Sequence, residues 1–154
     1  MRLIEKELAL LIPLAVGIGG VFLGSKLTAA RSHREFVRER TAQAYSIILE
    51  ALFDLQNWFS VNLDDHLECR EVDEATDKER REAYRAAKDR LDRTLAREEW
   101  LLPDRVQEVF TEMRKVFAAR YEGWFEDLEE SYAATKQART KLISIARSHL
   151  GKPR

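Results

Sequence analysis

The chain has 154 residues, of which 45% are hydrophobic and 34% are charged, and its formal net charge is −1. This length allows one domain with a modest core. The even balance of charge disfavours both a general affinity for nucleic acid and disorder, and a single cysteine, Cys69, excludes an internal disulfide and is typical of a reducing compartment.

The first element along the chain is an uncharged block at residues 8–25, LALLIPLAVGIGGVFLGS. Ten of its 18 residues are Leu, Ile, Val or Phe, which favours insertion into a bilayer. As a helix the block is about 27 Å long and, with its flanks, just spans the hydrocarbon core. A cleaved signal peptide is disfavoured by the acids in MRLIEKE, and a buried core helix by the abrupt change to charged sequence. We therefore predict a transmembrane anchor over residues 1–30.

The bases around this block predict its orientation. Two precede the block, and five follow it within about 15 residues, so the longer C-terminal part is expected on the cytoplasmic side and the N-terminus outside. This is the topology of a single-pass protein of the bacterial inner membrane. Four of the following bases form a basic flank that we expect to face anionic lipid headgroups, although a solvated helix face is the alternative: Lys26, Arg31, Arg34 and Arg38.

Small residues recur on one face of the predicted span, at Gly17, Gly20 and Gly24. The last two make a GxxxG pattern, which lets the backbones of two membrane helices approach closely. We therefore expect the span to pack against copies of itself in a homo-oligomer. In a higher oligomer, this face or the opposite one would surround a pore.

The rest of the chain is predicted to be helical almost throughout, because it lacks strand-like alternation and contains few helix breakers. The first cytoplasmic helix is expected from about residue 32 to residue 68, and no breaker separates it from the span, so the two should form one continuous helix. Phe53 and Trp58 widen its apolar stripe. That stripe recurs at helical spacing: Tyr45, Ile48, Leu52, Leu55, Phe59 and Leu63.

The segment CREVDEATD, residues 69–77, is the predicted turn. Thr76 followed by Glu79 has the spacing of a capping box, so the second helix should begin there. It should end where Pro103 disfavours helical geometry for the preceding residue, and Pro103 is then the expected first residue of the next helix, with Asp104 against its dipole. The apolar stripe of the second helix is narrow: Tyr84, Ala87, Leu91 and Leu95.

From Val106 the apolar periodicity continues to His149 without a phase break. It predicts either one helix of over 40 residues or, with a reversal near Gly123, the third and fourth helices of a bundle. In the second case the basic segment 136–154, with six bases and no acid, returns to the membrane.

No residue pattern indicates catalysis or a cofactor. There is no P-loop, nucleophile elbow or other catalytic motif. The best metal-ligand candidates lie together in one short segment, where Asp65 with Cys69, or His66 with Cys69, could share a helix face: Asp64, Asp65, His66, Glu68 and Cys69. A zinc site needs four ligands of defined geometry, however, and no second Cys or Cys/His cluster completes one. We therefore interpret these residues as a solvated helix end and expect neither metal nor cofactor.

Two aromatic pairs, Trp58 with Phe59 and Trp124 with Phe125, resemble platforms for stacked bases. Because they recur at helical spacing beside Leu and Tyr, we interpret them as core residues instead. Nucleic acid is therefore not an expected partner.

Four segments in order, SKLTAARSHRE, AYSIILEALFDL, WLLPDRVQEVF and IARSHLG, resemble a widespread set of uncharacterised bacterial single-span proteins with cytoplasmic helical bundles. The layout is also similar, more distantly, to small HEPN-like membrane pores that accompany CRISPR effectors, without the HEPN motif, in which an Arg is followed by a His after four to six intervening residues. The first resemblance implies a bacterial inner-membrane setting; it carries over no functional residue and adds no mechanism.

The expected fold is all-α, with a transmembrane anchor at residues 1–30, an antiparallel bundle of three or four long helices at 31–150 and a tail at 151–154. The expected function is that of a non-enzymatic, homo-oligomeric interaction module that contacts membrane lipids and an unidentified cytoplasmic protein. The alternative is an oligomeric pore or membrane-disrupting effector of a phage-defence or toxin system.

Overall fold

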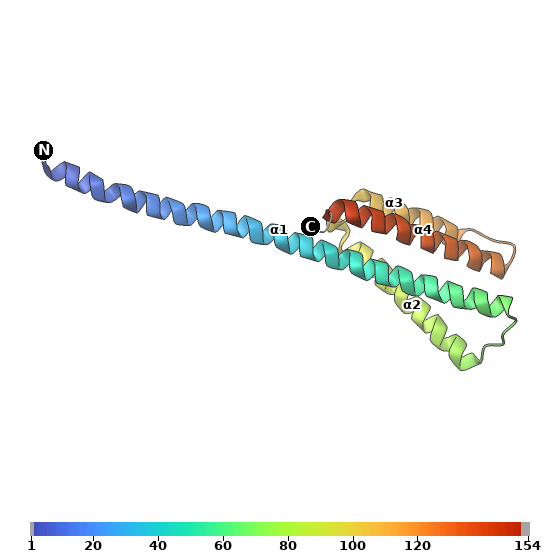
Figure 1. Ribbon diagram of the computed structural model, residues 1–154. Coiled ribbons are helices and arrows are strands. Elements are labelled where there is room, and N and C mark those ends of the chain that lie inside the picture. Colours follow the sequence, from blue (N-terminus) through green and yellow to red (C-terminus); the bar gives the residue numbers. More distant parts are fainter. Residues whose placement is uncertain (1, 152–154) are drawn as a thin grey trace. The chain divides into compact units, whose positions relative to one another are not determined.

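The computed structural model describes the backbone of residues 2–151 and the side chains of residues 31–151. All the regular structure in this part of the chain is helical (Figure 1): α1 (Arg2–Leu67), α2 (Glu74–Arg97), the 3₁₀ helix η1 (Glu99–Leu101), α3 (Asp104–Ala118) and α4 (Trp124–Leu150). The predicted all-α fold is confirmed, and α1 is continuous as expected. The chain divides into two compact units, Met1–Glu39 and Arg40–Arg154, which are described separately.

The first unit contains the N-terminal part of α1. Among the described residues, no helix combines the length and the apolar character needed to cross a membrane. The predicted span falls on residues whose side chains lie outside the described part, as do the residues assigned to its packing and to the start of its basic flank: Gly17, Gly20, Gly24 and Lys26.

The rest of the basic flank is described. Arg31 pairs with Glu35 one helical turn later, with its Nε 3.1 Å from the carboxylate, and both side chains are well exposed. Arg34 and Arg38 are exposed as well. Residues 31–39 hold three arginines and two glutamates, so this segment carries only a small excess of positive charge.

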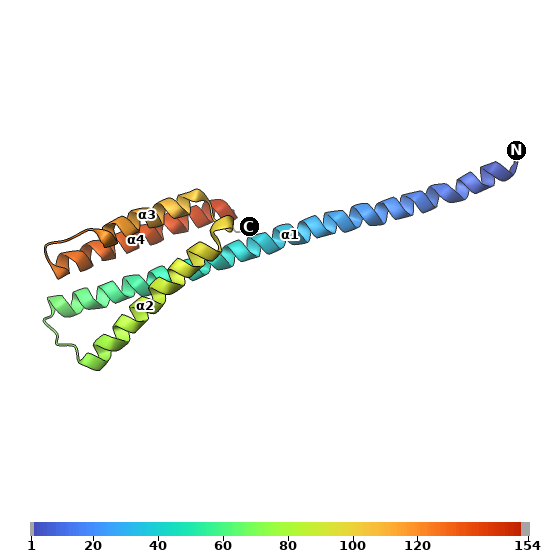
Figure 2. The ribbon, with the colours of Figure 1, turned by 180° about the vertical axis from the view of Figure 1, so that it is seen from behind.

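The second unit is a bundle of four helical segments, namely α1 after Arg40, α2, α3 and α4. Both ribbon views show α3 and α4 side by side in opposite directions (Figures 1 and 2). Its core confirms the predicted stripes of the first two helices, with Leu63 and Tyr84 partly buried against it. The buried members with the largest side chains are Tyr45, Ile48, Leu52, Leu55, Phe59, Leu91, Leu95, Leu102, Phe110, Met113, Leu128 and Leu142.

The reversal near Gly123 is present, so the four-helix alternative is confirmed and a single helix of over 40 residues is wrong. α3 ends at Ala118, and Gly123 is the extended N-cap of α4. Glu126 and Asp127 lie in the first turn of α4, where negative charge complements the helix dipole. The Glu126 carboxylate also accepts the backbone N–H of Glu122 at 3.3 Å, which ties the loop to the new helix.

Two helix starts differ from the prediction. The N-cap of α2 is Asp73, whose carboxylate accepts the Thr76 backbone N–H at 3.0 Å and the Thr76 hydroxyl at 2.6 Å. The expected cap at Thr76 is wrong, because the stronger carboxylate acceptor three residues earlier captures the N–H groups of the first turn. Pro103 is the N-cap of α3 rather than its first residue, so that Asp104 begins the helix.

Two aromatic side chains predicted in the apolar core lie at the surface. Phe53 is 53% exposed, with the Arg139 guanidinium 5.5 Å above its ring. Trp124 is 56% exposed, because the reversal makes it the first residue of α4, at the end of the bundle. The core interpretation holds for Phe59 and for Trp58, which packs against the core, and it is wrong for Trp124.

Candidate functional site at the two ends of the bundle

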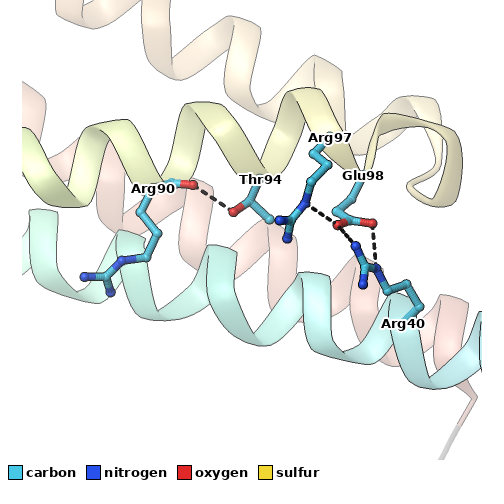
Figure 3. Close-up of polar contacts among 5 residues, drawn as sticks. All are labelled: Arg40, Arg90, Thr94, Arg97 and Glu98. Atoms are coloured by element: carbon cyan, nitrogen blue, oxygen red, sulfur yellow. Dashed lines mark hydrogen bonds and ion pairs between the residues drawn. The ribbon is translucent and has the colours of Figure 1, made fainter.

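A buried carboxylate joins α1 to the end of α2 at one end of the bundle (Figure 3). Glu98, which caps the C-terminus of α2, is 2% exposed. Arg40 on α1 donates to both of its oxygens, from Nε to Oε2 at 3.1 Å and from Nη2 to Oε1 at 2.7 Å. Arg97 donates from Nε to Oε1 at 2.7 Å. Because a bidentate arginine pair fixes geometry as well as charge, this cluster holds α1 against the turn between α2 and α3.

The two arginines set the charge of this buried carboxyl. Hydrogen bonding from Arg40, helped by Arg97, holds the pKa of Glu98 below its ordinary value, against the opposing effect of burial. The same hydrogen bond raises the pKa of the Arg40 guanidinium. The cluster is therefore ionised at neutral pH and acts as a structural clamp rather than as a proton carrier.

The same end carries a second contact between helices and an exposed tryptophan. The Tyr45 hydroxyl on α1 lies 3.0 Å from Nδ1 of His149 on α4, and burial raises the pKa of Tyr45, so the hydroxyl is protonated at neutral pH. Trp100, in η1, is 69% exposed. We call residues 40–45, 93–105 and 145–151 the arginine end; they hold five bases, all arginine, and three acids.

The opposite end is formed by the loops that join α1 to α2 and α3 to α4 (Figures 1 and 2). The His66 ring, near the end of α1, stacks on Phe125 with the ring centres 5.0 Å apart and meets Trp124 at 5.6 Å. Asp65, which is 8% exposed, accepts a hydrogen bond from Arg80 of α2 at 2.5 Å. These contacts join the C-terminus of α1 to α4 on one side and to α2 on the other.

The surface around these contacts is both acidic and apolar. We call residues 64–74 and 119–127 the acidic end; they hold nine acids and two bases. Leu67 is 67% exposed, Val72 38% and Trp124 56%. This end of the bundle therefore combines exposed apolar side chains with an excess of carboxylates.

A pocket of about 400 Å³ lies between α1 and α2. Its apolar walls include Val61 and Ala83, and the Trp58 indole nitrogen is buried nearby without a hydrogen-bond partner among the described residues. The two arginines that line it are already paired, Arg80 with Asp65 and Arg90 with Asp54 at 3.2 Å. The pocket is therefore lined by apolar groups and by arginines that are already ion-paired, which leaves little charge to orient a ligand.

The predicted metal-ligand candidates do not converge. Asp65 is occupied by Arg80, His66 packs on aromatic rings, and Cys69 is exposed beyond the end of α1 with a φ of 53°. In the part of the chain that the structure describes, no three His, Cys, Asp or Glu side chains are grouped to hold a metal ion.

Sequence reasoning missed the clamp and the exposed tryptophans. Arg40 and Glu98 are 58 residues apart, and no local spacing connects them. Trp100 had a local signal, because it directly follows two acids and precedes Leu-Leu-Pro, as expected of a turn rather than a core helix. Trp124 had a similar signal in the preceding glycine.

Comparison with known protein families, with curated proteins and with solved structures finds no match to this chain.

Proposed function

We propose that this protein is a membrane-anchored, homo-oligomeric adaptor without enzymatic activity. Residues 1–30 hold it in the bacterial inner membrane, and the four-helix bundle binds a cytoplasmic protein. The observation that carries this proposal is the contrast between the ends of the bundle: one is rich in arginine with an exposed Trp100, and the other is acidic with exposed Leu67 and Trp124.

Chain connectivity supports an orientation for this adaptor. The chain enters the bundle at Arg40, in the arginine end, soon after the expected anchor. Bases near anionic lipid gain about 1 kcal/mol each, so the arginine end suits the membrane side. The acidic end is repelled by the same lipids and suits the cytoplasmic side. The basic flank strengthens this bias: Lys26, Arg31, Arg34 and Arg38.

The buried polar groups of the bundle support a scaffold role. Glu98 is held by two arginines, and Asp65 by Arg80. Thr135, which is fully buried in α4, donates its hydroxyl to the carbonyl of Ser131 at 2.8 Å. Because each of these groups is already hydrogen-bonded within the bundle, none of them is offered to a ligand.

Membrane anchoring is tested by fractionation of cells that produce the full chain. The wild type should remain in the membrane pellet after washing at high salt and high pH. Val16→Arg places a charge in the middle of the apolar block, at a cost of about 2.5–3.5 kcal/mol to insertion, and should release a large fraction. Thr28→Arg, outside the block, is the matched control and should stay in the pellet. Wild-type protein in the soluble fraction would contradict the anchor.

The glycine face supports the second candidate function, an oligomeric pore. Induced expression would then collapse the membrane potential, as measured with a potential-sensitive dye, and Gly20→Ile would abolish the collapse. An adaptor should instead leave the potential unchanged.

A further inference from the structure

We infer that the acidic end is a docking surface for a basic amphipathic segment of a partner protein. This inference rests on the adaptor function proposed above. The surface is defined by residues 64–74 and 119–127. Its occupant is a cationic helix that carries apolar residues on one face.

The apolar part of the docking surface consists of Trp124, whose ring meets that of His66, and of Leu67, the last residue of α1. Both Trp124 and Leu67 are more than half exposed, although they are among the most apolar side chains of the chain. Tryptophan is enriched among the residues that dominate binding energy at protein interfaces. Because the Trp124 ring already contacts the His66 ring, its exposed part can be buried against a partner without rearrangement.

The charge around these residues selects the partner. Asp64, Glu71 and Glu122 form no ion pair with any residue that the structure describes, and all three are exposed. Asp65 and Glu68 are already compensated in part by Arg70. The uncompensated negative charge repels anionic lipid and nucleic acid and attracts Lys and Arg, so it raises the association rate of a cationic partner.

The apolar and acidic features together favour an amphipathic helix. Apolar side chains on one helix face would cover Trp124 and Leu67, while basic side chains beside them would meet the surrounding carboxylates. A purely basic and flexible segment would leave the tryptophan exposed, and a purely apolar one would leave the carboxylates without partners.

The test uses full-length protein in nanodiscs of zwitterionic lipid and a fluorescent Lys/Leu peptide of about 18 residues, or about five helical turns. A peptide of the same composition, scrambled to remove the apolar face, is the ligand control. Empty nanodiscs give the binding to lipid, which is subtracted. Binding is followed by fluorescence anisotropy at low and at high salt.

The matched protein variants lie at the two ends. Trp124→Ala with Leu67→Ser removes the apolar anchors, and Glu71→Gln with Glu122→Gln removes two uncompensated charges. As controls, Trp100→Ala and Glu99→Gln each make one change of the same kind, the loss of a tryptophan and the loss of a carboxylate, at exposed positions of the arginine end. Circular dichroism and thermal melting check that each variant is folded.

We expect the amphipathic peptide to bind more tightly than the scrambled one and to bind less tightly at high salt. Either acidic-end variant should weaken binding by about tenfold, while the arginine-end variants leave it unchanged. Equal binding of the two peptides, or equal losses at both ends, would overturn the inference. So would a change in oligomeric state, rather than in peptide affinity, for Trp124→Ala with Leu67→Ser, because that result would assign the surface to a second copy. A protein that stays in the membrane pellet but fails to bind the peptide refutes this inference and leaves the anchor intact.

Discussion

Glu98→Gln tests the clamp between α1 and α2 most sharply, because it removes charge while keeping nearly the same shape. In the parent, Glu98 accepts three hydrogen bonds from two arginines at 2.7–3.1 Å. A glutamine keeps one oxygen but presents an NH₂ group to an arginine donor, so at least one charge-assisted bond is lost. A hydrogen bond to a charged group contributes about 1.5–3 kcal/mol.

The structure places the expected effect at the lower end of that range. The side chains of Arg40 and Arg97 are 38% and 64% exposed, so water can solvate their guanidinium groups again once the carboxylate is gone. We expect Glu98→Gln to lower the free energy of unfolding by about 1.5–2 kcal/mol, or Tm by roughly 5–10 °C. Urea denaturation of the full chain in mild detergent measures this. Glu99→Gln is the control, since Glu99 is the exposed neighbour, and it should change stability by less than about 0.5 kcal/mol.

The pH dependence of this difference identifies its cause. Because the folded-state pKa of Glu98 is depressed, its carboxylate stabilises the fold fully above the unfolded-state pKa of about 4.3 and loses this effect as pH falls through the lower folded-state value. The gap between the parent and Glu98→Gln should therefore be constant from about pH 7 to pH 5 and shrink below about pH 4. A gap that persists unchanged at low pH, or no gap at neutral pH, would refute the clamp.

Three other changes test separate parts of the account. Phe110→Ala should lower the free energy of unfolding by about 3–5 kcal/mol, because the Phe110 side chain is fully buried. Trp124→Ala should lower it by only about 1–2 kcal/mol, because about half of the Trp124 surface is exposed. Equal losses in chemical denaturation would show that Trp124 belongs to the core. Asp73→Ala should lower Tm and helical content, because it removes the N-cap of α2. Asp73→Asn should retain both, because asparagine is also a good N-cap. Equal losses in the two variants would show that the charge of Asp73 matters rather than its capping hydrogen bond. Gly20→Ile should shift the detergent-solubilised protein toward monomer in light scattering without unfolding the bundle, and an unchanged oligomer would assign assembly to the cytoplasmic helices.

The helices were predictable where one face of a helix is buried along its whole length. Ile48 and Leu52 are four residues apart in α1, as are Leu91 and Leu95 in α2, and all four lie in the core. Burial of one helix face leaves this periodic pattern in the sequence. The pattern could not decide whether the chain reverses at Gly123, because the apolar spacing happens to stay in phase across the loop. Gly123 followed by Glu126 and Asp127 is the better indicator here, because acidic side chains in a first turn are stabilised by the helix dipole. This local pattern predicts a new helix start, whereas the apolar periodicity predicts a continuous helix.

The surfaces at the bundle ends were less accessible from sequence. The Arg40–Glu98 pair depends on how α1 packs against the end of α2, which no local pattern encodes. Trp124 continues the apolar periodicity of the core positions. In the first turn of α4, however, a residue at this spacing lies outside the core. Charge was more informative than periodicity here, since the acidic run 64–74 is visible in the sequence and coincides with an end of the bundle.

Thiol labelling can determine whether residues 1–30 anchor the protein with the bundle on the cytoplasmic side, because the chain has one cysteine and that cysteine is exposed at the acidic end. Full-length protein in the membrane fraction is treated with a membrane-impermeant maleimide, applied to spheroplasts or to inside-out vesicles. A second protein carries Arg2→Cys in a Cys69→Ser background and reports on the N-terminus. We predict that Cys69 reacts only in inside-out vesicles and that the cysteine at position 2 reacts only in spheroplasts. Labelling of Cys69 from outside, or of both positions from the same side, would contradict the account.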